Sequence, residues 1–99
     1  MTELNGKQKR YLRGLANQIK STISVGKAGI TENTLLSVRN GFNTAELLKI
    51  KVQDGCQIEK DEVGEIIAKG VGASVVQVLG STVLFYRPHP DHPKINLPQ

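Results

Sequence analysis

A predicted strand is connected to a predicted helix by the stretch Ser24-Val25-Gly26-Lys27-Ala28-Gly29-Ile30-Thr31. The two glycines are able to adopt φ > 0 and have no side chain that would hold a ligand off the backbone. Thr31 is a typical helix N-cap, and Ile30 and Leu35 have the spacing of a hydrophobic staple. The N–H groups of a helix start, together with the side chain of Lys27, suit a phosphate. The same residues also suit a tight strand-to-helix turn, and the loop alone does not separate the two interpretations.

The length and composition predict one small domain. A chain of 99 residues corresponds to a radius of gyration of about 13 Å and to a single core. Cys56 is the only cysteine, which excludes an internal disulfide and a cysteine-cluster metal site and is typical of a reducing compartment. No apolar run reaches the ~18 residues of a membrane span, and the first residues do not resemble a signal peptide. We therefore expect a cytoplasmic protein without a membrane partner.

Charge is segregated along the chain. The net charge is +4. Residues 4–29 contain no acidic residue and six basic ones, namely Lys7, Lys9, Arg10, Arg13, Lys20 and Lys27. Residues 54–65 contain five acidic residues and one lysine. A basic face separated from an acidic end predicts a polyanionic partner.

The segment from Gly6 to about Lys20 is predicted to be an amphipathic helix, with Asn5 as N-cap and Gln8 completing a capping box. Its apolar stripe consists of Tyr11, Leu12, Leu15, Ala16 and Ile19. The helical phase places a basic set on the opposite side: Lys9, Arg13 and Lys20, flanked by Arg10. Basic residues near a helix N-terminus oppose its dipole, so helix stability does not explain Lys7, Lys9 and Arg10. A solvated face is the alternative, but a face without acidic residues favours a functional interpretation.

The remaining patterns predict an α/β fold. The expected elements are a strand over 22–25, a helix over 32–43, a strand over 47–52, a helix over 59–69, and strands over 74–79 and 82–87. Gly80-Ser81 is typical of a two-residue II′ hairpin turn. The order α-β-α-β-α-β-β predicts a two-layer α-β sandwich with a four-stranded mixed sheet. Lys49 and Lys51 share one strand face, where they either bind phosphate or discourage edge pairing.

The apolar periodicity also predicts the residues of the core. The second helix is expected to face the core with Leu35, Val38 and Phe42, with Leu36 beside them. From the third helix we expect Val63, Ile66 and Ile67. The strands are expected to contribute Leu48, Ile50, Val52, Val76, Val78, Val83 and Phe85, with the last four dependent on register.

The end of the chain is rich in proline. Pro88, Pro90, Pro93 and Pro98 predict a segment without helix or strand. We expect residues 1–88 to form the domain and residues 89–99 a flexible tail whose removal leaves the fold intact. The two histidines of this tail have no third ligand nearby, so the pattern does not favour a metal site.

No residue pattern points to catalysis. The ordered part has no Cys/His or Ser/His pair, and the spacing from Gly26 to Gly29 is too short for a phosphate loop of the Walker type. We predict no catalytic residue, metal, cofactor or small-molecule substrate. The few aromatic residues indicate that backbone and shape recognition outweighs base readout.

Four separated blocks of the chain resemble the CRM domain, the chloroplast RNA splicing and ribosome maturation domain, in its bacterial single-domain (YhbY-like) form. The blocks are 4–16, 25–31, 46–52 and 76–88, the last with its gap at the hairpin turn. The resemblance implies an RNA-binding α/β fold similar to the C-terminal domain of translation initiation factor 3. It also implies association with ribosomal RNA in precursors of the large (50S) ribosomal subunit.

The resemblance assigns residues as well. The Gly-x-x-Gly loop of the family corresponds to Gly26, Lys27, Ala28 and Gly29, and its basic first helix to Lys7, Lys9, Arg10 and Arg13. The family often has Thr where this chain has Asn5, and both residue types cap helices. We therefore expect an RNA-binding ribosome-assembly factor, with Lys49 and Lys51 extending its site. A protein-interaction adaptor whose basic face docks an acidic partner is the alternative.

Overall fold

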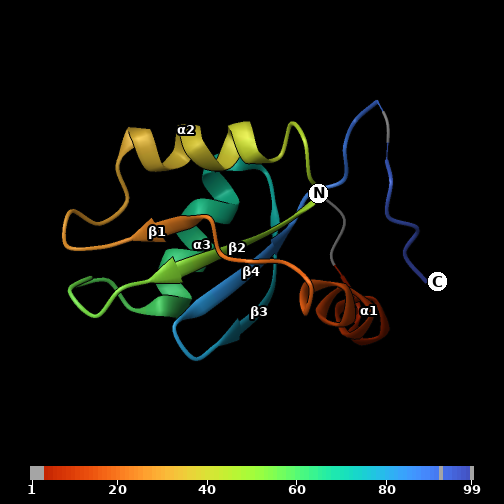
Figure 1. Ribbon diagram of the computed structural model, residues 1–99, viewed down its shortest axis with the longest axis horizontal. Helices are drawn as coiled ribbons and strands as arrows, with labels where there is room; N and C mark the ends of the chain where they lie inside the picture. Colours follow the sequence, from red (N-terminus) through yellow and green to blue (C-terminus); the bar gives the residue numbers. More distant parts are fainter. Residues whose placement is uncertain (1–3, 92, 99) are drawn as a thin grey trace.

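The computed structural model describes residues 4–91 and 93–98. Along the chain its elements are α1 (Gly6–Ala16), β1 (Ile23–Val25), α2 (Glu32–Gly41), β2 (Leu47–Val52), α3 (Lys60–Val71), β3 (Ser74–Leu79) and β4 (Thr82–Tyr86) (Figure 1). The predicted order α-β-α-β-α-β-β is confirmed. The Cα radius of gyration is 12.7 Å, close to the expected value.

The four strands form one mixed sheet in the order β1-β2-β4-β3. The first two strands run parallel, with Ser24 opposite Lys51, and are joined by the crossover helix α2. Strand β4 pairs antiparallel with both β2 and β3. Because β2 lies inside the sheet, Lys49 and Lys51 project from a central strand. Lys51 is paired on both sides, with Ser24 of β1 and Thr82 of β4, so protection of a sheet edge does not explain it. Lys49 is paired with Leu84 of β4 alone.

Helices cover the two faces of the sheet unequally. On one face, α2 and α3 pack over the larger core, where Val38, Ile50, Ile67 and Phe85 are among the buried residues. On the other face, α1 packs over a second cluster that consists of Leu4, Leu12, Ala16, Leu47, Val76, Leu84 and Tyr86. Figure 1 shows α1 at one end of the sheet. The α/β sandwich with its mixed sheet is confirmed, and α1 adds partial cover on the face away from α2 and α3.

Both predicted N-caps are present. Asn5 Oδ1 accepts from the Gln8 N–H at 2.8 Å while the Gln8 side chain accepts from the Asn5 N–H, which completes a capping box. Thr31 caps α2 in the same manner with Thr34. Helix α1, however, ends at Ala16 and not near Lys20. Backbone bonds from Gln18 to Leu15 and from Ile19 to Ala16 tighten its last turn, and the chain then extends toward β1.

Two residues assigned to the core lie at the surface. Leu36 of α2 is 52% exposed and Ile66 of α3 is 38% exposed, because both helices turn these positions away from the sheet. Helix α2 ends at Gly41, and α3 continues to Val71 before Gly72 closes it in the left-handed conformation at φ +70°. The other predicted core positions of these helices, Val38, Phe42, Val63 and Ile67 among them, are buried or half-buried.

A β-bulge changes the face to which β3 residues point. The pairing steps from Val75 opposite Phe85 to Gln77 opposite Leu84, which leaves Val76 as the extra residue. Val76 is buried beneath α1, whereas Val78 packs half-buried on the opposite face. After the bulge, Gln77 and Leu79 therefore share the face on which α1 lies. The following turn has Gly80 at φ +58° and Ser81 at negative φ, as a II′ turn requires.

The C-terminal segment contains no helix or strand in its described part, as its prolines predict. It nevertheless lies against the domain on the side of α1 (Figure 1). Ile95 and Leu97 pack half-buried on the cluster beneath α1, and the Gln8 side chain donates to the Pro98 carbonyl at 3.1 Å. These contacts differ from the expected free tail. The domain boundary at residue 88 and the flexibility of the segment stay predictions.

Candidate functional site

The loop between β1 and α2 forms a compact turn. The Gly29 N–H donates to the Gly26 carbonyl at 2.9 Å, and Lys27 and Ala28 are exposed at the tip. Gly29 has φ +72°, so its glycine is required by the backbone. Gly26, although able to adopt positive φ, does not do so.

Gly26 instead lies against the end of the flexible Gln53 side chain. A Cβ atom on Gly26 would lie 2.8 Å from Gln53 Oε1, and one on Gly55 would lie 3.8 Å from Lys27 Cβ. The loop is thus held beside the turn that follows β2. Within the described residues, the Lys27 side chain makes no hydrogen bond or ion pair, although Asp54 belongs to the neighbouring turn. Lys27 is therefore a solvent-exposed cation on a constrained loop.

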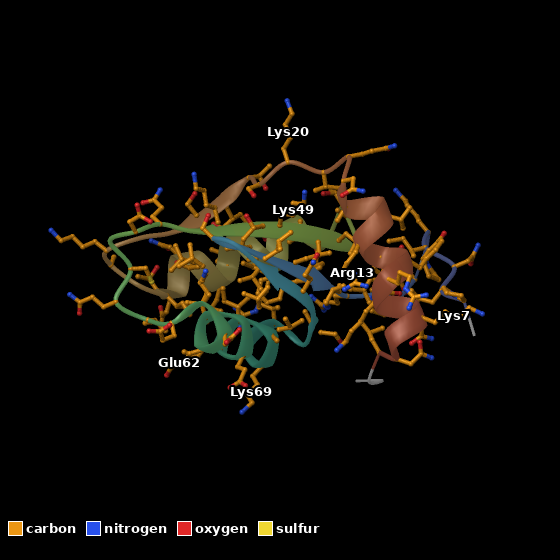
Figure 2. The ribbon with its side chains drawn as sticks, turned by 90° about the horizontal axis from the view of Figure 1, so that it is seen from below. Lys7, Arg13, Lys20, Lys49, Glu62 and Lys69 are labelled. Atoms are coloured by element: carbon orange, nitrogen blue, oxygen red, sulfur yellow. The ribbon has the colours of Figure 1, made fainter. Side chains whose placement is uncertain are left out.

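The basic residues of α1 lie on its outer surface. Leu12 and Ala16 anchor the helix to the sheet, while Lys7, Arg10 and Arg13 are exposed and Lys9 is half-buried. Lys7 and Arg13 project from this helix in Figure 2. Lys20 does not belong to it, because α1 ends before this residue; Lys20 extends from the connection to β1 (Figure 2). The basic helix face therefore consists of Lys7, Lys9, Arg10 and Arg13.

The sheet lysines stand on the same face as α1. Lys49 lies opposite Leu84 of β4, and Lys51 lies between Ser24 of β1 and Thr82 of β4. Lys49 is half-buried and Lys51 is exposed. Arg13 and Lys49 line one hollow of about 150 Å³ between the end of α1 and the sheet. The structure therefore brings a helix residue and a sheet residue of the predicted site together.

The structure does not bring α1 and the glycine loop together. They lie at opposite ends of the sheet, along the longest dimension of the molecule (Figure 1), which spans 38 Å. Lys49 and Lys51 occupy the sheet between these ends, since Lys51 is level with the last residues of β1. The predicted residues thus follow the sheet from one end to the other, with sheet lysines linking the two outer groups.

Acidic residues are concentrated on another part of the surface. Asp61, Glu62 and Glu65 belong to α3, which covers the opposite sheet face, and Glu62 projects away from Lys49 in Figure 2. Within the described residues, no hydrogen bond or ion pair engages the side chains of Lys9, Arg10, Arg13, Lys49 or Lys51. These cations are available to an anionic partner without displacing an internal contact.

Glu46 is the structural residue that sequence reasoning missed. The residue is 5% exposed, and its carboxylate accepts hydrogen bonds from backbone N–H groups of the C-terminal segment: His89 at 2.8 Å, Lys94 at 2.6 Å and Ile95 at 2.7 Å. Burial raises the pKa of Glu46, but the three backbone donors outweigh it and hold the pKa below its usual value. Burial, and secondarily this carboxylate, raises the pKa of Tyr86. The sequence feature that could have drawn attention to Glu46 is an acidic residue immediately before an apolar strand.

The described residues include no group of three or more His, Cys, Asp or Glu side chains suited to a metal ion. The Cys56 thiol donates to the Ile58 carbonyl at 3.6 Å. No helix in the described part of the chain is both long and apolar enough to cross a bilayer.

Comparison with known proteins places this geometry in a family context. A family model for the CRS1 / YhbY (CRM) domain matches residues 4–87. "Probable RNA-binding protein YqeI" of Bacillus subtilis is 34% identical over 95 residues, covering 96% of this chain and 99% of that protein. An "RNA-binding protein" of Haemophilus influenzae is 35% identical and covers 100% of this chain and 99% of its own length.

A solved structure matches the fold. The solution structure of a Staphylococcus aureus protein, described as a hypothetical protein and a candidate RNA-binding protein, superimposes with a TM-score of 0.82 at 36% identity. The match covers 97% of this chain and 100% of the other. The α/β fold of this chain is therefore shared with the Staphylococcus aureus protein.

Proposed function

The chain belongs to the CRS1/YhbY (CRM) domain family, and from this premise we propose that it is an RNA-binding protein whose basic residues contact phosphates. The observation that carries the proposal is a set of cations on the sheet face away from acidic α3, whose side chains make no hydrogen bond or ion pair within the described residues: Lys9, Arg10, Arg13, Lys49 and Lys51. Such an arrangement favours sequence-independent binding to a polyanion. Two relatives that align over nearly their whole length are named as RNA-binding proteins.

The glycine loop is proposed as a second phosphate contact. Its tip presents Lys27 and exposed backbone next to the capped N-terminus of α2. The N–H groups at a helix start and its positive dipole favour an anion. Because this loop and α1 lie at opposite ends of the sheet, a single RNA chain that contacts both must cross the face with Lys49 and Lys51.

We further propose that the RNA is ribosomal and that the protein assists assembly of the large (50S) subunit. Support for this finer assignment comes from the resemblance to the ribosome-maturation family alone. The test is crosslinking in growing cells followed by sequencing of the RNA bound to the protein. Reads concentrated in large-subunit ribosomal RNA and its precursors are the expected result. Reads distributed in proportion to total cellular RNA would contradict the ribosomal assignment, while RNA binding itself would stand.

The alternative, an adaptor that docks an acidic protein, predicts a different response to salt. RNA binding releases condensed counterions, so the logarithm of the affinity falls linearly with the logarithm of the salt concentration. Titration of the purified protein with single-stranded RNA over a range of salt concentrations measures this slope. No detectable RNA affinity at low salt would contradict the proposal and favour the adaptor.

A further inference from the structure

The hollow beside α1 differs in chemistry from the rest of the basic surface. Residues of α1 and of β2, β3 and β4 form its walls, among them Arg13, Asn17, Lys49, Gln77, Leu79 and Leu84. Its volume of about 150 Å³ is smaller than the ~300–1,000 Å³ of pockets that enclose a drug-sized ligand. The site therefore has room for a single group of a larger partner rather than for a separate whole ligand.

The β-bulge of β3 places the side chains of Gln77 and Leu79 at the hollow. If β3 alternated regularly from Val75, Gln77 would face the core of α2 and α3; with the bulge, Gln77 and Leu79 face the hollow. Bulges commonly redirect a side chain toward a functional site. Leu79 is 67% exposed there, the largest exposure among the large apolar side chains of the described residues. An exposed leucine beside an amide and two cations is not explained by packing.

The hollow combines the three kinds of contact that an unpaired nucleotide needs. Arg13 and Lys49 supply positive charge for a phosphate, and neither has a partner within the described residues. The amides of Asn17 and Gln77 offer both donors and acceptors, as the edge of a base requires. Leu79, which is exposed beside the buried Leu84, provides an apolar surface for the face of a base.

We propose that this hollow receives one unpaired nucleotide of the RNA, with Arg13 and Lys49 contacting the phosphate and Asn17 and Gln77 contacting the base. The inference rests on the proposed RNA-binding function and extends it from charge to base recognition. A base in an RNA duplex is stacked and paired, and its edge does not reach a hollow of this kind. The site therefore selects single-stranded RNA, or a loop or bulge within folded RNA.

The test compares short single-stranded homopolymers of U, C, A and G with a blunt duplex of equal length. The wild-type protein is expected to bind one homopolymer about tenfold more tightly than another, the size of discrimination that hydrogen bonds to a base edge provide. Gln77→Ala should remove most of this discrimination with the salt slope unchanged. Arg13→Ala and Lys49→Ala should weaken binding to every homopolymer and lower the salt slope by about 0.7 each.

A second variant distinguishes the loss of an RNA contact from a folding defect at the bulge. Leu79→Ser replaces an exposed side chain at the end of β3, so its melting temperature should match the wild type, and its affinity for single-stranded RNA should fall with duplex affinity unchanged. Lys69→Ala on α3 is the control and should bind as the wild type.

If Gln77→Ala and Leu79→Ser bind all RNAs as the wild type while Arg13→Ala weakens binding to all of them, the nucleotide site is refuted and the basic surface stands. If the wild type binds none of these RNAs, both proposals are refuted.

Discussion

The Glu46 carboxylate accepts a hydrogen bond from the Ile95 backbone N–H at 2.7 Å, which joins the residue before β2 to the C-terminal segment. The same oxygen accepts from Lys94 and the other from His89. One buried carboxylate thereby satisfies three backbone donors of a segment whose described residues form no helix or strand. These three hydrogen bonds join the segment to the domain through a side chain rather than through a sheet or helix ladder.

Glu46→Gln is expected to destabilise the fold. The neutral amide keeps the shape but loses the charge-assisted hydrogen bonds, and such bonds to charged groups contribute about 1.5–3 kcal/mol. We expect the free energy of unfolding to fall by roughly 1–3 kcal/mol in denaturant titrations. Glu59→Gln is the matched control, since Glu59 is exposed and its side chain makes no capping bond. Equal losses in the two variants would contradict the role of Glu46.

The pH dependence of stability follows from the lowered pKa of Glu46. A carboxyl whose pKa is lower in the folded than in the unfolded state stabilises the fold above the unfolded value of about 4.3. This contribution is lost as pH falls through the folded pKa. The stability difference between wild type and Glu46→Gln should therefore be constant from about pH 7 to pH 5 and shrink below about pH 4. A difference that grows on acidification has the wrong sign for this mechanism.

Removal of residues 91–99 is expected to lower the melting temperature, contrary to the prediction made from the prolines. The truncated chain loses two of the three donors to Glu46 and the packing of Ile95 and Leu97. A loss of roughly 2 kcal/mol corresponds to about 8–16 °C in a domain of this size. Lys94→Ala in the full chain is the control, because it retains the backbone N–H. An unchanged melting temperature of the truncated chain would restore the expectation of a free tail.

The two loop glycines should respond differently to alanine. At Gly29 the backbone has φ +72°, so Gly29→Ala should cost about 1–2 kcal/mol of stability, and Gly29→Val more. Gly26→Ala meets only the end of the flexible Gln53 side chain and should be nearly neutral once that side chain moves. Thermal unfolding of the two variants measures the contrast. Equal losses of stability in Gly26→Ala and Gly29→Ala would show that the positive φ is not the reason for a glycine at position 29.

Local signals predicted much of the fold. The capping residues Asn5 and Thr31 predicted where two helices begin, because a cap contacts a residue three positions further along the chain. Alternation predicted β2 over 47–52 with its lysines on one face. These features depend on neighbours along the chain, and a single sequence contains that information.

Features set by distant contacts were not predictable in the same way. The face on which α1 packs depends on where Leu12 and Ala16 find apolar partners in β2, β3 and β4. The bulge at Val76 shifts a strand by one residue, which alternation alone does not reveal. Glu46 was not singled out from the sequence, because its donors lie more than forty positions away. For the candidate site, sequence named the cations but not the hollow that joins Arg13 to Lys49.

The central claim is that RNA phosphates contact cations on α1, on the open sheet face and on the glycine loop. The most direct test is the salt dependence of single-stranded RNA affinity for two triple variants with the same net charge. One variant changes Lys9, Lys27 and Lys51 to Ala, one cation from each part of the surface. The other changes Arg39, Lys60 and Lys69 to Ala, which are residues of α2 and α3.

Each phosphate contact contributes about 0.7 to the slope of log affinity against log salt for a single strand. The account predicts that the first variant lowers the magnitude of this slope by about 2 and weakens binding at low salt, while the second retains nearly the wild-type slope and affinity. Equal slopes for the two variants would contradict the account, because binding would then depend on total charge and not on this surface.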